Sequence, residues 1–239
     1  MSALAVFFVA IGIADICRRL TDRRWLTLCC GPVVALACAL LAGLWHVGDL
    51  VLVAISAAAI VGWVLLCART ERDGARPAAP LLVFGAAVVV LGALAGWASP
   101  VAGLVGRWLP WVGLDSVEPT HAVMTVGVVL LQLVTGNQLV RLVLGSVGAV
   151  RPAGEPQPSD RLKGGRLLGP MERLLILGLG LGGQLAAATA VIAAKGIIRF
   201  PELNSQRREG DSGIDELTEY FLVGSFASWL LALAGIGLA

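Results

Sequence analysis

Apolar runs of about twenty residues recur along this chain, and that length is what a helix needs to cross the hydrocarbon core of a bilayer. The mean hydropathy is +0.85, and 57% of the 239 residues are hydrophobic while 14% are charged. A soluble chain of this length could bury a core with far fewer apolar residues. We therefore predict an all-α, polytopic transmembrane helix bundle.

The apolar runs define about seven predicted spans, at residues 2–17, 25–45, 50–68, 79–98, 120–142, 170–195 and 217–237. The first run is interpreted as a retained span because no Lys or Arg precedes it and its first charge is Asp15. Lys and Arg cluster in the loops after the first, third and fifth spans, and the positive-inside bias assigns those loops to the cytoplasm. The N-terminus is then outside and the C-terminus cytoplasmic, in a multi-pass protein of the cell inner membrane.

Two long loops divide the predicted chain. Residues 1–149 form a five-span membrane region, and its outer loop at 99–119 mixes Trp, Gly and Pro, as interfacial segments do. Residues 150–169 form a cytoplasmic linker rich in Pro and Gly. Residues 170–239 form a two-span hairpin that carries most of the informative charges.

Composition also limits the partners and cofactors. A formal net charge of +2 without a basic stripe argues against nucleic-acid binding. The five cysteines lie in or beside apolar runs, with no C-x-x-C and no His pair, so the sequence predicts no metal site and no cofactor. The expected partners are membrane lipids and an anionic small molecule or lipid, and a homo-oligomer or a membrane partner subunit stays open.

Ionisable residues within spans are the candidates for function, because a charge that faces lipid costs several kcal/mol. Asn137 and Arg141 are one helical turn apart in the fifth span, and Glu172 and Arg173 begin the sixth. Because adjacent spans run antiparallel, these four residues should lie at the same depth. We predict that they form an inner polar cluster.

A second cluster is expected at the outer end of the same hairpin. Lys195 and Arg199 share one helix face, and Glu202 follows within a turn. Glu219 and Tyr220 begin the seventh span, which returns beside the sixth. The two cations would bind an anionic group, and Glu202, Glu219 and Tyr220 are the candidates for acid or base roles in an enzyme.

The hairpin resembles the C-terminal part of an uncharacterised family of bacterial integral membrane proteins. The similarity covers 169–228, about a quarter of the chain, with the pattern G-x-x-E-R, A-A-K-x-x-x-R-F-x-E and E-Y-x-x-x-G-[ST]-x-x-S. The matching positions are Glu172, Arg173, Lys195, Arg199, Phe200, Glu202, Glu219, Tyr220, Gly224, Ser225 and Ser228. The resemblance implies a site at these positions, and no established activity comes with the family.

Three functions are compatible with these features. The first is binding of an anionic small molecule or lipid head group between the fifth, sixth and seventh spans, in a transport or accessory role. The second is an intramembrane enzyme that acts on an isoprenoid or lipid phosphate by acid and base chemistry. The third is a non-catalytic membrane subunit whose polar clusters hold helices together. The sequence favours the first.

Overall fold

The computed structural model describes residues 1–21, 23–74, 76–149, 165–208 and 214–239, with the side chains of 73, 165–167, 198–208 and 214–217 left aside. Every regular element in these ranges is helical, which confirms the all-α prediction for them. The elements are α1 (Ser2–Leu20), α2 (Arg24–Ala42), α3 (Val47–Asp73), α4 (Ala78–Ala93), η1 (Ala95–Trp97), α5 (Gly103–Trp111), α6 (Pro119–Leu130), η2 (Leu131–Thr135), α7 (Gly136–Ser146), α8 (Gly165–Leu181), α9 (Leu185–Arg208) and α10 (Ile214–Leu238).

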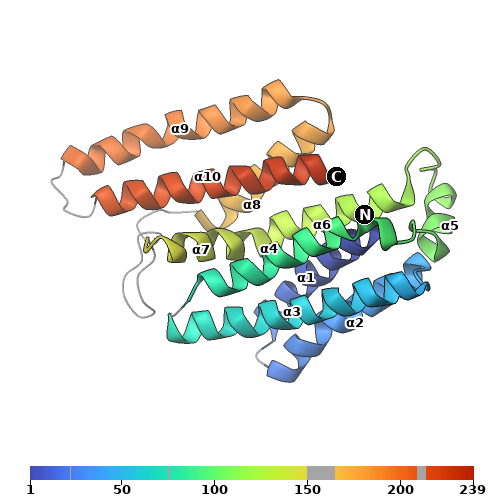
Figure 1. Cartoon of the computed structure of the whole chain (residues 1–239). Coiled ribbons are helices and arrows are strands. Elements are labelled where there is room, and N and C mark those ends of the chain that lie inside the picture. Colours follow the sequence, from blue (N-terminus) through green and yellow to red (C-terminus); the bar gives the residue numbers. More distant parts are fainter. Residues whose placement is uncertain (22, 75, 150–164, 209–213) are drawn as a thin grey trace.

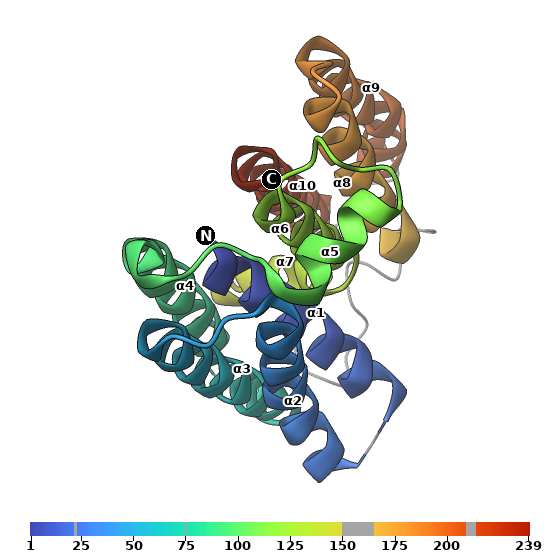
Figure 2. The same cartoon turned by 90° about the vertical axis from the view of Figure 1, so that its right-hand side faces the viewer.

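The first helix lies enclosed within the bundle. α1 packs against α2, α3 and α6, and the end-on view of Figure 2 shows it among its neighbours. Its apolar residues are buried almost without exception from Ala3 to Ile11. Phe84 of α4 contacts Phe7, Phe8 and Trp63, with ring centroids 5.6–6.5 Å apart. The core of the N-terminal part is therefore built around α1.

Within the described residues, four helical stretches are long and apolar enough to cross a membrane. They are Arg24–Ala42, Val47–Arg72, Pro119–Ser146 and Thr218–Leu238. Between 22% and 50% of the residues in their apolar windows are buried inside the structure. Soluble monomers do not expose apolar surface on this scale, so these bare faces are suited to lipid. The features are those of a membrane protein, and they do not confirm a count of seven spans.

The predicted sixth span is wrong as a single helix. α8 ends at Leu181 and α9 begins at Leu185, and Gly183 between them has φ +74°. The Gln184 N–H donates to the Leu179 carbonyl at 2.8 Å, which closes the end of α8 as a left-handed glycine cap does. The chain then turns back, so that α8 and α9 lie side by side (Figure 1).

This extra reversal changes the placement of the C-terminus. Ser2 Oγ donates to the Ser99 carbonyl, and the Ala239 carbonyl lies 3.3 Å from His121 Nδ1. Both termini therefore lie at the end of the bundle that holds the 99–121 connection (Figure 1). The prediction placed them on opposite sides because it counted 170–195 as one crossing.

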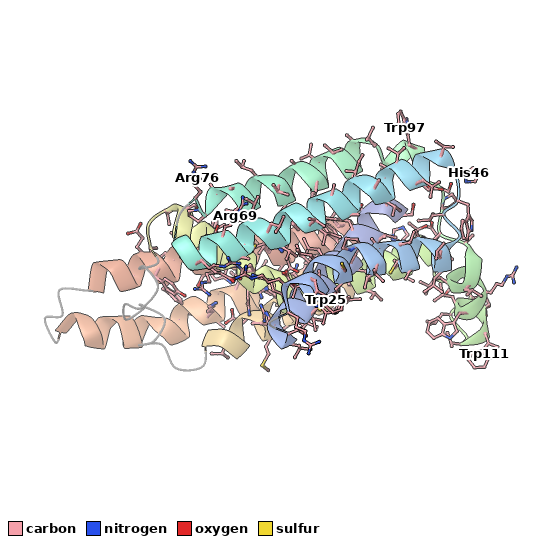
Figure 3. All side chains as sticks on the ribbon, turned by 90° about the horizontal axis from the view of Figure 1, so that it is seen from below. Trp25, His46, Arg69, Arg76, Trp97 and Trp111 are labelled. Carbon is pink, nitrogen blue, oxygen red and sulfur yellow. The ribbon has the colours of Figure 1, made fainter. Side chains whose placement is uncertain are left out.

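The two ends of the bundle differ in their exposed residues. His46, Trp97 and Trp111 lie at one end, and Arg69 and Arg76 lie toward the other (Figure 3). The separation matches the alternation of aromatic and basic loops along the sequence, and which end faces the cytoplasm stays a prediction. The loop 99–119, predicted to be the outer one, contains the short helix α5. Of the predicted linker 150–169, residues 150–164 lie outside the described part, and α8 already begins at Gly165.

The predicted fifth span is one continuous stretch with an irregular centre. α6, η2 and α7 follow without a break from Pro119 to Ser146, and η2 is a π-helix. A π-helix inserts a residue into the α-helical register and shifts the side chains that follow it. Such insertions are frequent at functional sites, and this one lies against both α1 and α8.

Candidate functional site

Arg173 is the centre of a polar site between four helical elements. Its Nε and Nη2 donate to the Gln132 carbonyl of η2 at 3.1 and 2.9 Å. Nη2 also donates to Asn137 Oδ1 of α7 at 2.6 Å, and Nη1 donates to Ser228 Oγ of α10 at 3.2 Å. The side chain is 1% exposed. A single guanidinium thus connects α8 to three other elements.

The position of Arg173 along its helix places the charge in the interior. It lies eight residues from Gly165 and eight from Leu181, about 12 Å from either end of α8 at 1.5 Å per residue. The sequence prediction began this helix at 170, which would leave Arg173 beside the lipid head groups. The structure begins it five residues earlier, so the site lies at mid-depth of the bundle, where a charge needs partners.

The described hydrogen-bond acceptors of Arg173 are all uncharged: a carbonyl, an amide oxygen and a hydroxyl. The neighbouring carboxylate, Glu172, accepts instead from Lys195 Nζ at 2.5 Å. Two cations and one carboxylate leave this group of described residues with a net charge of +1. Because a buried charge is costly without an opposite charge nearby, the site is matched to an anion.

The Glu172–Lys195 pair exists because α9 folds back along α8. The two side chains are 20% and 18% exposed, so water has little access to the pair. Lys195 Nζ also lies 5.9 Å from the ring centroid of Phe221 on α10, within the range of a cation–π contact. The clusters predicted at opposite ends of one span therefore meet: Lys195 of the outer cluster joins Glu172 of the inner one.

Other predicted residues are placed differently. Arg141 is exposed on α7, away from the buried Arg173, so it does not complete the inner cluster. Glu219 is exposed and Tyr220 is half-buried. The prediction paired Lys195 with Glu219. In the structure, the carboxylate that pairs with Lys195 is that of Glu172. The two remaining candidates, Arg199 and Glu202, belong to α9 with side chains outside the described part of the structure.

Gln132 was not among the predicted site residues, and Ser228 was named only as a position of the family resemblance, without a role. Gln132 contributes its backbone carbonyl, and no sequence signal announces the π-helix that directs it. Ser228 is 4% exposed and follows Gly224 by one turn on α10. A stripe of small residues predicts close helix packing, and a serine within such a stripe is a signal that could have identified it as a hydrogen-bond partner.

A second polar group lies at the end of the bundle that holds the 99–121 connection, and it has the residue types of a serine hydrolase. Ser99 Oγ lies 2.9 Å from His46 Nδ1, and Asp49 Oδ2 lies 3.5 Å from the same nitrogen. A nucleophilic triad needs the serine and the carboxylate on opposite ring nitrogens. Asp49 also accepts from the His46 and Ser99 backbone N–H groups. The group therefore caps α3 and anchors the 99–101 segment.

The described residues contain no set of three His, Cys, Asp or Glu side chains placed to hold a metal ion. Comparison with family models, curated proteins and solved structures finds no match for this chain. The resemblance of the hairpin to a bacterial membrane protein family stays a prediction.

Proposed function

We propose that this chain is a multi-pass inner-membrane protein that binds an anionic small molecule or lipid head group at the Arg173 site, in a transport or accessory role. The Arg173 site comprises Arg173, Glu172 and Lys195 with their partners on η2, α7 and α10. The observation that carries the proposal is a buried guanidinium whose described acceptors are all neutral, beside an ion pair that is already balanced.

Three features support the transport role. The site lies at mid-depth, beside the π-helix η2 and on the two helices, α8 and α9, that are joined by the reversal at Gly183. Many transporters bind their cargo near the bilayer midplane, where helices are interrupted. Lys195 is held by a single carboxylate, so an incoming anion could compete with Glu172 for it.

One observation favours the non-catalytic alternative. Arg173 makes four hydrogen bonds to three elements, which is what a residue that locks helices together would also do. The enzyme alternative has less support, because Glu219 and Tyr220 do not pair with the cations in the described structure and the Ser99, His46 and Asp49 geometry is a cap.

Two substitutions with opposite effects on charge separate these functions. Lys195→Met lowers the net charge of the site by one, and Glu172→Gln raises it by one and frees the Lys195 ammonium. For an anion site we expect affinity to fall about tenfold in the first and to rise about tenfold in the second, since each step corresponds to about 1.4 kcal/mol. Arg141→Met, an exposed cation of α7, is the matched control and should change little.

The purified protein in detergent is titrated with sodium sulfate and with short-chain phosphatidylglycerol, and binding is measured by native mass spectrometry or calorimetry. Short-chain phosphatidylcholine tests the dependence on net charge. If both substitutions lower thermal stability and neither changes affinity in the expected direction, the site is a helix lock. Turnover of a lipid extract by the detergent-solubilised protein would favour an enzyme, because transport needs two compartments and chemistry does not.

A further inference from the structure

A buried carboxylate lies on α1, which packs against η2 as α8 does. Asp15 of α1 is 1% exposed, and its Oδ1 accepts a hydrogen bond from Trp63 Nε1 at 3.1 Å. Its other oxygen, Oδ2, has no hydrogen-bond partner among the described residues. The Thr135 hydroxyl of η2 is buried and close enough to interact with this carboxylate, but neither Thr135 Oγ1 nor Asp15 Oδ2 makes a hydrogen bond of normal geometry with a described residue. Two unsatisfied oxygens thus share one buried location.

The positive charge closest to Asp15 is directed elsewhere. Arg18 Nε lies 3.6 Å from Asp15 Oδ1, which is too long for a hydrogen bond. Arg18 Nη1 instead donates to Glu71 Oε1 at 2.8 Å. Two carboxylates therefore share one guanidinium, and Glu71 has the better geometry. Burial disfavours the ionised form of a carboxyl group that lacks a full set of partners, so Asp15 is the member of this group suited to take up a proton.

The charged and titratable groups around Asp15 come from each neighbouring element. They are Arg18 and Arg19 on α1, Cys67 and Glu71 on α3, and, as uncharged polar neighbours, Trp63, Thr135 and Gln138. Arg18 favours the ionised form of Asp15, while Glu71 weakens that effect by competing for the guanidinium. Arg19 and Glu71 are exposed, so solvent and head groups screen their charges more strongly than that of Arg18.

The π-helix connects the two sites. Arg173 donates to the Gln132 carbonyl, and Arg19 Nη2 donates to the Val134 carbonyl at 2.9 Å. Thr135, the last residue of η2, lies near Asp15. One segment of five residues therefore borders both the cationic Arg173 site and the buried carboxyl group.

We propose that Asp15 is a proton-binding site coupled to the Arg173 site through η2, so that binding of an anion is accompanied by uptake of a proton. The inference rests on the proposed function of the Arg173 site. The sign follows from electrostatics. The net positive charge at Arg173 opposes protonation of Asp15, and an anion bound there removes that opposition. By linkage, protonation of Asp15 raises the affinity for the anion equally.

A proton fits this site better than a metal cation does. At Asp15, the buried oxygens without a described hydrogen-bond partner are Asp15 Oδ2 and Thr135 Oγ1, whereas hard cations take about six oxygen ligands. The Arg18 guanidinium beside Asp15 would also repel a cation. A proton needs one oxygen, and Asp15 Oδ2 makes no hydrogen bond of normal geometry with a described residue that would have to be broken.

The first experiment observes Asp15 itself. Infrared difference spectra of the full-length protein in lipid nanodiscs are recorded as the pH falls, for the wild type and for Asp15→Asn. We expect a protonated-carboxyl band in the wild type that is missing from the variant. Thr135→Val keeps the shape of the side chain but removes a hydroxyl that can stabilise the carboxylate, so the same band should appear at higher pH. A band that is identical with and without Asp15→Asn overturns the proposal.

The second experiment tests the coupling without any ligand. Lys195→Met should move the titration of Asp15 to higher pH, and Glu172→Gln should move it to lower pH, each by on the order of half a pH unit. Each variant is compared with the same variant carrying Asp15→Asn, so that other carboxyl groups cancel. Arg107→Met makes the same change of charge on α5, at the far end of the bundle, and is the control. Shifts of equal sign, or none, overturn the coupling.

The third measurement separates the two proposals. Sodium sulfate is added to the weakly buffered protein, and proton uptake is followed with a pH indicator. Sulfate that binds with proton uptake in the wild type, and without it in Asp15→Asn, supports both proposals. Sulfate or phosphatidylglycerol that binds without uptake refutes the coupling alone. If neither anion binds while the Asp15 band titrates and shifts as expected, the anion site is refuted and the proton site stands.

Discussion

Replacement of Arg173 by methionine tests the energetic role of the buried guanidinium. Four hydrogen bonds from a charged donor are lost, and bonds of that kind contribute about 1.5–3 kcal/mol each, or roughly 6–12 kcal/mol together. Removal of the charge also removes its desolvation penalty, which is several kcal/mol. The difference is a net loss of about 3 kcal/mol, and the Gln132 carbonyl and the Asn137 amide oxygen are left without this donor.

For a chain of this length, a loss of about 3 kcal/mol corresponds to a fall in Tm of roughly 6–12 °C. Thermal unfolding in detergent, followed by size-exclusion chromatography of the surviving fraction, measures it. Arg173→Lys keeps the charge but has a single donor group in place of the planar fork. Its Tm should therefore lie between that of the wild type and that of Arg173→Met. Arg141→Met is the control, because Arg141 is exposed. A fall below about 2 °C for Arg173→Met, or an equal fall for Arg141→Met, would refute the reasoning.

Two further predictions concern the fold. Gly183→Ala should destabilise the protein by about 1 kcal/mol because φ is +74° there, whereas Gly178→Ala, in the last turn of α8 with nothing within 4 Å of the added methyl group, should be neutral or stabilising; equal Tm values for the two variants would contradict the turn. Tags fused to the N- and C-termini should be accessible to an impermeant reagent from the same side of sealed vesicles, as their shared end of the bundle requires, and labelling from opposite sides would restore the seven-span arrangement.

The helical class and most helix positions could be predicted from hydropathy, because the length of an apolar run reports directly on the hydrocarbon thickness. The break at Gly183 could not be found in this way. Residues 170–195 are apolar on both sides of the turn, so a window average does not distinguish one crossing from two shorter helices. The pair of glycines before Gln184 was the available signal, because glycine readily adopts the left-handed conformation that ends a helix.

Most residues of the Arg173 site were predicted from the sequence, but their arrangement in space was not. Asn137, Glu172, Arg173 and Lys195 were selected because ionisable and amide groups are rare and costly within apolar runs. Their arrangement depends on two backbone irregularities, the π-helix and the reversal at Gly183, which no local pattern of polarity encodes. Arg141 shows the consequence. It lies one turn after Asn137 in the sequence, yet Asn137 bonds Arg173 and Arg141 is exposed.

A coupled anion site and proton site explains both Arg173 and Asp15, whereas a helix lock explains only Arg173. As a helix lock, Arg173 accounts for its own hydrogen bonds, but it does not account for a carboxyl group at Asp15 with one oxygen unsatisfied beside the same π-helix. Each charge is costly in a bilayer when considered alone. Opposite charges at Asp15 and Arg173 lower each other's cost, and an anion that neutralises Arg173 leaves Asp15 with only the guanidinium of Arg18, which it shares with Glu71. A proton then neutralises Asp15, so the arrangement that makes both charges tolerable at rest is also what would couple their ligands.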